Sequence, residues 1–140
     1  MKKEIIVLMF IILFNIGAGL STPFIFSVHA NVASSTKTIF PGDSLIVNTE
    51  VRSLGLGSKK LIDANVIYTV LDSNNNLILK KESVIALQTY FSASQVFQIP
   101  ENAKPGMYHV TAEVNYDRYR DISSDSFFIK KKTILGNLFK

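Results

Sequence analysis

The sequence predicts an all-β domain, a seven-stranded antiparallel sandwich that follows an N-terminal hydrophobic helix. Two observations lead to this prediction. Beyond residue 30, short segments alternate apolar and polar residues, which is the period of a half-buried strand, and no window keeps the period of a helix. Clusters of Gly, Pro, Asn and Asp separate these segments at the spacing typical of a sandwich.

The first 30 residues predict an export signal. Lys2 and Lys3 precede an unbroken apolar run at residues 5–14, small residues follow at positions 17–19, and the segment closes on Ala30. A basic start, an apolar centre and a small residue at the cut are typical of a secretory signal peptide. We therefore expect residues 1–30 to be a signal peptide that is cut after Ala30.

An anchor that is never removed is the alternative for the same segment. Residues 5–28 carry no charge and are long enough, as a transmembrane helix, to cross a hydrocarbon layer of about 30 Å. Gly17, Gly19 and Pro23 interrupt that helix in its second half, which favours the cleaved signal. The lysines at the start stay inside in both cases. Residues 31–140 are therefore expected outside the cytoplasm, either secreted or anchored at the cell surface.

Charge is distributed unevenly along the chain. The net charge is +4, but residues 31–129 hold 9 Lys and Arg against 10 Asp and Glu. The positive excess lies near the C-terminus, at Lys130 and in a basic tail at residues 131–140. This distribution argues against a nucleic-acid-binding face on the domain. We expect membrane contact to involve only the N-terminal helix and these C-terminal lysines.

The domain is expected at residues 31–130, and its core alone must hold it together because the chain has no cysteine. Its first half predicts four strands, at residues 32–40, 45–52, 63–72 and 77–87. Pro41 and Gly42 suit the centre of a type II turn, since Pro fixes φ and Gly accepts positive φ. The Asp- and Asn-rich string at residues 72–76 predicts a hairpin between the third and fourth strands.

The second half predicts three further strands, at residues 88–99, 108–116 and 123–131. Pro100 ends the first of these by withholding an N–H. Residues 104–107 fit a second type II turn, centred on Pro105 and Gly106. Tyr108 follows this turn at the place of a tyrosine corner, in which the hydroxyl bonds back to the backbone of the preceding loop. We therefore predict structural roles for Pro105, Gly106 and Tyr108.

The strings VFQIPENAKPGMYHVTAEVNYD and SFFI resemble the closing half of immunoglobulin-like modules on prokaryotic surface proteins. They are also similar to the second macroglobulin-like domain of alpha-macroglobulins. In those families a Phe and an Ile-Pro pair precede a Gly-x-Tyr strand, and PGDSLIV and VIYTVLDSNNNLI fit their opening strand and hairpin. The resemblance covers residues 37–130 and implies an immunoglobulin-like sandwich that is a non-catalytic module. The sequence contains neither a thioester region nor tandem repeats, which argues against protease trapping.

Few reactive groups are available for catalysis. The expected mature chain has no cysteine, one histidine and no Gly-rich phosphate loop, so few catalytic sites can be built. We expect that histidine, His109, to be solvated on the outer face of a strand. The sequence thus predicts a non-enzyme with no catalytic residues and no cofactor. A hydrolase remains an alternative, which would need a nucleophile and an acid beside His109.

Acidic and amide side chains do not form a complete metal-binding motif. Asp72, Asn74 and Asn76 match the first three ligand positions of a calcium loop, but its sixth and twelfth positions hold Leu and Ser instead of Gly and an acid. Asp121 and Asp125, like Asp117, have no metal-ligand spacing of their own. We therefore predict no metal site and a plain hairpin turn after Asp72.

The hairpin between the last two strands is the candidate partner-binding site. Its residues interleave aromatic and cationic side chains: Tyr116, Arg118, Tyr119 and Arg120. Tyr and Arg are favoured contact residues, and this loop often forms a binding edge in immunoglobulin-like folds. In the alternative interpretation Tyr116 belongs to the core, and the arginines pair with Asp117 and Asp121 for solubility.

Together these features predict an exported, non-catalytic binding or structural module of the cell surface or envelope. Its expected partner is a protein or an envelope polymer, and not nucleic acid. The alternative is a membrane-anchored assembly subunit that pairs with its neighbours through exposed sheet edges.

Overall fold

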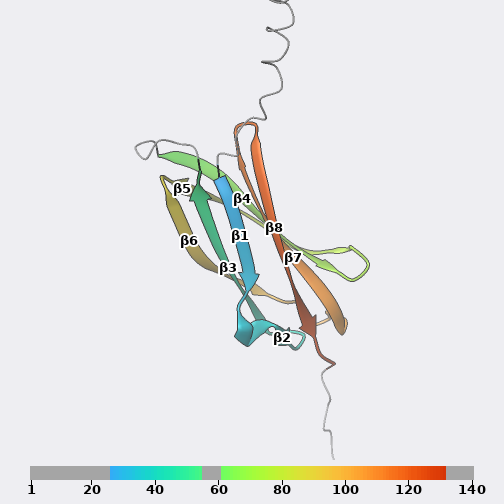
Figure 1. Ribbon diagram of the computed structural model, residues 1–140. Helices are drawn as coiled ribbons and strands as arrows, with labels where there is room; N and C mark the ends of the chain where they lie inside the picture. Colours follow the sequence, from blue (N-terminus) through green and yellow to red (C-terminus); the bar gives the residue numbers. More distant parts are fainter. Residues whose placement is uncertain (1–25, 55–60, 132–140) are drawn as a thin grey trace, which may run out of the picture.

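The computed structural model describes residues 26–54 and 61–131, and this part of the chain is almost entirely β-structure (Figure 1). A turn of 3-10 helix, Ser34–Thr36, joins the first two strands. The eight strands described are β1 (Phe26–Val32), β2 (Thr38–Ile39), β3 (Ser44–Ser53), β4 (Ile62–Asp72), β5 (Leu77–Leu87), β6 (Tyr90–Gln98), β7 (Gly106–Tyr116) and β8 (Tyr119–Ile129). The predicted all-β class is confirmed.

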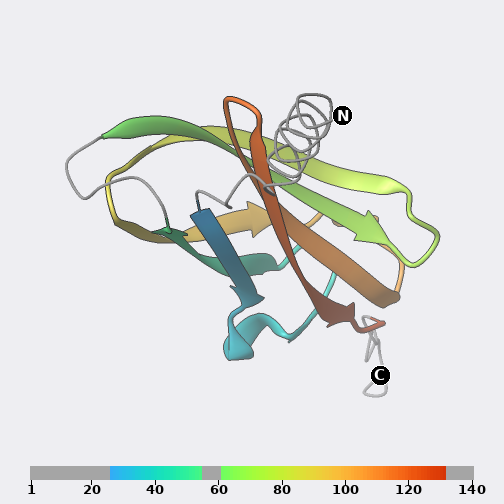
Figure 2. The same ribbon diagram turned by 45° about the horizontal axis from the view of Figure 1, so that its top comes forward.

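The strands form two sheets, which Figure 2 shows as two layers. One sheet has three strands in the order β1-β3-β6, and the other has five in the order β2-β8-β7-β4-β5. β2 runs parallel to β8, whereas the other strand pairs described are antiparallel. The prediction of a purely antiparallel sandwich is therefore wrong at this short pair.

Alternation within the strands builds the core between the two sheets. Every second residue of β4 from Ile62 to Val70 is buried, and β7 repeats the pattern from Tyr108 to Val114. The rings of Tyr68 and Phe97, one from each sheet, lie 5.4 Å apart between centroids. Burying a side chain of this kind contributes about 2 kcal/mol. Since the chain has no cysteine, this core holds the two layers together.

The strand predicted at residues 32–40 is divided between the two sheets. β1 belongs to the three-stranded sheet and β2 to the five-stranded sheet, and the 3-10 turn carries the chain across. Thr36 fixes the crossing, because its Oγ1 accepts from the N–H of Ile46 at 3.2 Å and donates to the Ala33 carbonyl at 3.1 Å. The predicted count of seven strands is therefore too low, since eight are described.

β1 begins at Phe26, inside the segment predicted to be a signal or anchor. Phe26, Val28 and Ala30 point into the core and are 2%, 8% and 3% exposed. The described sandwich therefore includes residues that the sequence assigned to the signal or anchor, because an apolar buried strand and the end of an apolar signal look alike in sequence. The helix predicted before Phe26 and the tail from residue 132 lie outside the described residues.

Residues 26–54 and 61–131 contain no helix that is long and apolar enough to cross a membrane.

The two predicted Pro-Gly turns have different outcomes. The turn at residues 40–43 forms as predicted, with the N–H of Asp43 bonded to the Phe40 carbonyl at 3.1 Å and Gly42 at φ 88°. The second predicted turn, at residues 104–107, does not form. The chain turns earlier, where the N–H of Ala103 bonds to the Pro100 carbonyl at 3.0 Å, and Gly106 is the first residue of β7.

Tyr108 fixes the approach to β7. Its side chain is buried and packs on the ring of Phe127 at 5.5 Å between centroids. Its hydroxyl donates to the Lys104 carbonyl at 2.8 Å, four residues back. This hydrogen bond orients the loop that joins β6 in one sheet to β7 in the other.

Replacing Tyr108 by Phe tests this hydrogen bond. The variant keeps the buried ring and loses only the bond to Lys104, so we expect the free energy of unfolding to fall by about 1 kcal/mol. Urea denaturation measures it. Tyr90→Phe is the control, because that ring is 50% exposed on β6 and its change should stay within about 0.5 kcal/mol. Equal stability of the two variants would contradict a structural role for the Tyr108 hydroxyl.

Candidate functional site

The candidate binding residues gather at the turn between β7 and β8. Tyr116 and Tyr119 are paired across the two strands, and the turn between them consists of Asp117 and Arg118. Asp117 has φ 53°, a left-handed conformation that Asp tolerates better than most residues. The turn therefore projects Arg118 beyond the end of the sheet.

The two tyrosines are half-buried and pack against the core. The Arg118 side chain is exposed, and its guanidinium carbon lies 5.5 Å from the centroid of the Tyr119 ring. A cation over an aromatic face at this distance gains electrostatic attraction from the ring. Tyr119 thus holds Arg118 in place while the guanidinium keeps its hydrogen-bond donors available to solvent or a partner.

Arg120 lies beside the turn and pairs with a residue that the sequence did not suggest. Its guanidinium donates to Oε2 of Glu113 on β7 at 2.7 Å. The Arg120 hydrogen bond, helped by one from Asn115, lowers the pKa of Glu113 below its ordinary value. The alternative interpretation paired the arginines with Asp117 and Asp121. Arg120 bonds to Glu113 instead, because the register of β7 and β8 places Arg120 opposite Asn115, two residues from Glu113 on the same strand.

The start of β1 lies at the same end of the sandwich as this turn. Phe26, Ser27, Leu54 and Asp121 line a shallow hollow of about 210 Å³. Leu54 is 62% exposed. The end of the sandwich thus combines an exposed arginine, half-buried tyrosine rings and an apolar hollow, which are features of a contact surface.

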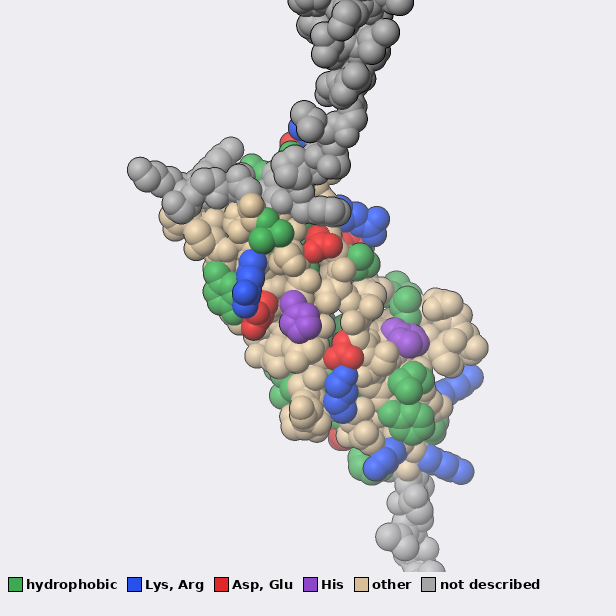
Figure 3. All heavy atoms as spheres, viewed as in Figure 1, with side chains coloured by type: hydrophobic (Ala, Val, Ile, Leu, Met, Phe, Trp, Pro, Cys, Tyr) green, Lys and Arg blue, Asp and Glu red, His purple; other side chains and the backbone are tan. Residues whose placement is uncertain are grey.

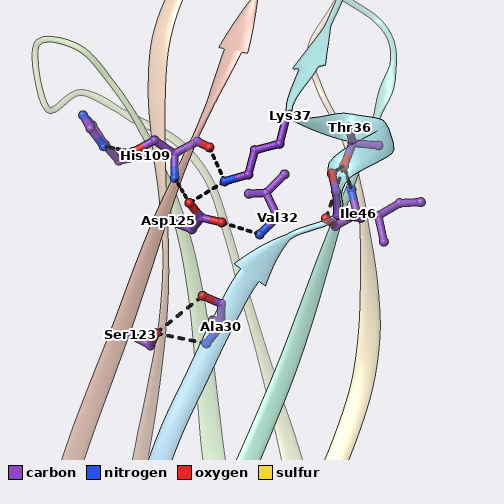
Figure 4. Close-up of polar contacts among 10 residues, drawn as sticks. Ala30, Val32, Thr36, Lys37, Ile46, His109, Ser123 and Asp125 are labelled. Carbon is purple, nitrogen blue, oxygen red and sulfur yellow. Dashed lines mark hydrogen bonds and ion pairs between the residues drawn. The ribbon is translucent and has the colours of Figure 1, made fainter.

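A row of β8 side chains ties the two sheets together along β1, and Figure 4 shows two of its members, Ser123 and Asp125. Each accepts a hydrogen bond from a backbone N–H of β1: Asp121 Oδ2 from Val28 at 2.8 Å, Ser123 Oγ from Ala30 at 3.0 Å, and Asp125 Oδ2 from Val32 at 2.7 Å. We call these three residues the β8 acceptor row. They satisfy backbone donors that would otherwise be open on the free edge of β1.

Sequence reasoning missed the acceptor row. The sequence suggests Asp125 only as a metal ligand and Asp121 only as a metal ligand or a partner of the arginines, and it does not single out Ser123. The available signal was the alternation of Asp, Ser and Asp at every second position of a strand, on the side that continues into Phe127 and Ile129. Small acceptors on an inward side of a strand indicate that something polar, here the β1 backbone, lies opposite them.

Asp125 makes the largest number of contacts in the row. Besides Val32, its carboxylate accepts from Lys37 Nζ at 2.5 Å and from the N–H of Ser126 at 2.7 Å. Partial burial acts to raise the pKa of Asp125, but the bonds from Lys37, Val32 and Ser126 together outweigh burial and hold the pKa below its ordinary value. The folded state thus favours the charged carboxylate.

His109 has one side-chain neighbour that matters for the hydrolase alternative. Its Nδ1 lies 3.0 Å from Ser126 Oγ. The adjacent acid, Asp125, directs its carboxylate to Val32 and Lys37 instead (Figure 4). Within the described residues the pair is therefore without the third group that orients a catalytic base. Figure 3 shows the two histidine side chains of the chain at separate places on the surface, so they do not share a site.

The Asp72 carboxylate accepts hydrogen bonds from residues of the turn that follows it. Its Oδ1 accepts from the N–H groups of Asn74 and Asn76 at 2.8 and 2.9 Å, and its Oδ2 accepts from Asn76 Nδ2 at 2.9 Å. The Asn76 side chain, followed by these backbone bonds, lowers the pKa of Asp72. The carboxylate thus faces the turn, and the ranges described contain no group of three His, Cys, Asp or Glu residues that could hold a metal.

No protein-family model matches the chain, and no curated protein matches it. Solved structures resemble its fold. A family 123 glycoside hydrolase from Clostridium perfringens matches with TM-score 0.51 at 15% identity, over 74% of this chain and 27% of that one. An alkylpurine DNA glycosylase from Pseudomonas fluorescens matches with TM-score 0.53 at 16% identity, over 76% of this chain and 31% of that one.

A CARDB domain from Pyrococcus furiosus also matches, with TM-score 0.49 at 10% identity, over 78% of this chain and 97% of that one. None of these three structures is a macroglobulin-like domain, so that part of the resemblance stays a prediction. The chain spans less than a third of the length of either enzyme. At such identities the likeness concerns the fold alone.

Acidification tests the role of Asp125. Because its pKa is lower in the folded than in the unfolded chain, its stabilisation is complete above the unfolded value and is lost as the pH falls below about 4. We expect Asp125→Asn to lower the free energy of unfolding at pH 7 by about 1 to 2 kcal/mol. In the same variant the free energy of unfolding should fall less steeply as the pH is lowered than it does in the wild type. Urea denaturation at several pH values measures this dependence.

Asp63→Asn is the matched control, because Asp63 is an exposed carboxylate on β4. We expect the control to follow the pH dependence of the wild type. If the free energy of unfolding of Asp125→Asn falls with pH as steeply as that of the control, the contacts of Asp125 contribute nothing to folding.

Proposed function

We propose that this chain is an exported, non-catalytic immunoglobulin-like module that binds a protein or polymer of the cell envelope through the end formed by the β7–β8 turn. Strand order is the observation that supports the immunoglobulin-like part of this proposal. With β1, β3 and β6 as strands A, B and E, the other sheet contains C, F and G as β4, β7 and β8. β5 then pairs beside C, as C′ does in variable-type domains.

The fold matches support a modular role. The chain aligns with only a domain-sized part of each of the two enzymes described above, 27% and 31% of their lengths. His109 and Ser126 meet without an oriented acid, so this pair does not favour the hydrolase alternative. Fold similarity alone does not assign function, so the proposal depends on the surface at the β7–β8 turn.

Binding through the turn fits the surface better than assembly through sheet edges. The free edge of β1 faces the β8 acceptor row, which occupies its N–H groups. The β5 edge carries Lys80, Lys81 and Glu82, and such charges oppose edge-to-edge pairing. Lys81 Nζ also donates a hydrogen bond to Gln95 Oε1 of β6 at 2.8 Å, which links β5 of one sheet to β6 of the other. We therefore favour the turn over the edges.

Arg118→Ala tests this proposal. The purified full chain, wild type or variant, is mixed with washed envelope fragments from the source cells, and the bound fraction is measured after sedimentation. We expect saturable binding of the wild type and a loss of affinity of about fivefold for the variant, the effect of a contact residue that contributes about 1 kcal/mol.

Arg52→Ala is the matched control. Arg52 is also exposed and also lies over a tyrosine ring, 5.7 Å from the centroid of Tyr90, but on the other sheet. It should bind like the wild type. Equal losses for the two arginine variants would indicate non-specific charge attraction, and unchanged binding of Arg118→Ala would exclude the turn as the contact site.

A further inference from the structure

We propose that the exported chain is processed among the small residues at positions 17–21, before Phe26, and not after Ala30. This inference rests on the proposed export of the chain. It concerns the position of the cut, which the sequence alone placed at the last small residue before a polar segment. The structure supplies the reason to move it.

A cut after Ala30 would remove most of β1. Only Asn31 and Val32 of its seven residues would remain. The strand pairs with β3 along its whole length, from Phe26 opposite Ser53 to Val32 opposite Val47. Without it, β3 would become the edge of a two-stranded sheet, and a sheet of that size is marginally stable in water.

The same cut would open the core. Phe26 is 2% exposed and is among the largest fully buried side chains, and Val28 and Ala30 are buried beside it. A large-to-small change at even one core site removes apolar contacts and leaves a cavity, and both effects destabilise a fold. Loss of the three side chains together would therefore strongly destabilise a domain that has no disulfide to compensate.

Two members of the β8 acceptor row would also lose their donors. Asp121 receives the N–H of Val28, and Ser123 receives that of Ala30. Both acceptors are partly buried, so their lost hydrogen bonds would be only partly replaced by water. The hydrogen bonds, the burial and the pairing with β3 thus agree that residues 26–30 belong to the folded domain.

The sequence offers a cut before this strand. Gly17, Gly19 and Ser21 are small residues spaced two apart, soon after the apolar run that ends at Phe14. A signal peptidase needs small residues at the last and third-last positions of the signal. Cuts after Gly19 or after Ser21 satisfy this requirement, and both leave β1 whole.

The reaction is hydrolysis of one peptide bond by a signal peptidase. Water supplies the hydroxyl that joins the carbonyl carbon of Gly19 or Ser21, and the carbon–nitrogen bond breaks. The released nitrogen takes a proton and becomes the amino terminus of Leu20 or Thr22.

The N-terminus of the natural protein tests the inference. The full-length gene is expressed in its source cells, the product is recovered from outside the cytoplasm, and its first residue is identified by mass spectrometry of the N-terminal peptide. We expect Leu20 or Thr22. A product outside the cytoplasm that begins at Asn31, or that still begins at Met1, would overturn the processing site and leave the proposed function standing.

Gly19→Phe and Leu20→Phe sharpen the test. Gly19 is a required small residue in both cuts, so its replacement should abolish the processed form. Leu20 occupies no such position, so its variant should be processed like the wild type. Normal processing of Gly19→Phe would overturn the inference. A wild-type chain found only inside the cytoplasm would overturn the proposed export and, with it, this processing site.

Discussion

The pairing of β1 backbone N–H groups with the side chains of β8 is the constraint on which the sandwich depends. Ordinary edge strands leave their donors open to solvent or to other chains. Here Asp121, Ser123 and Asp125 stand opposite alternate residues of β1 and accept those donors. The two sheets are therefore joined along one side by hydrogen bonds as well as by the apolar core. Residues 26–30 look like part of a leader in the sequence, but these hydrogen bonds hold them in β1 as part of the sandwich.

The same constraint orients the candidate binding surface. β8 is fixed to β1 by the acceptor row and to β7 by its backbone ladder, so the turn between β7 and β8 stands at the end of a well-supported hairpin. Half-buried Tyr116 and Tyr119 anchor the turn, and Arg118 remains exposed above Tyr119. A contact residue on a rigid support loses little conformational entropy when it binds. A rigid turn of this kind suits a binding module better than a flexible loop does.

Much of the fold could be predicted from alternation and turn residues, because burial on one face of a strand leaves a period of two in the sequence. β4 and β7 are such strands, and the Pro41-Gly42 turn follows from the dihedral preferences of its residues. The crossing at Thr36 was not predictable in this way, since it depends on the hydrogen bonds of one side chain. Alternation marks the inward side of β8, but the donors of the acceptor row lie 93 residues away in β1 and do not follow from that pattern. Arg120 was predicted at the site, but its partner Glu113 depends on strand register.

Amide hydrogen exchange of the full chain tests the central claim most directly. If β1 is held by β8, the N–H of Ala30 should exchange as slowly as that of Val66 in the core of β4, because Ser123 Oγ accepts it at 3.0 Å. Ser123→Ala should then speed the exchange of Ala30 and leave that of Val66 unchanged. Exchange of Ala30 at the rate of an unprotected amide in the wild type, or an unchanged rate in Ser123→Ala, would contradict the account.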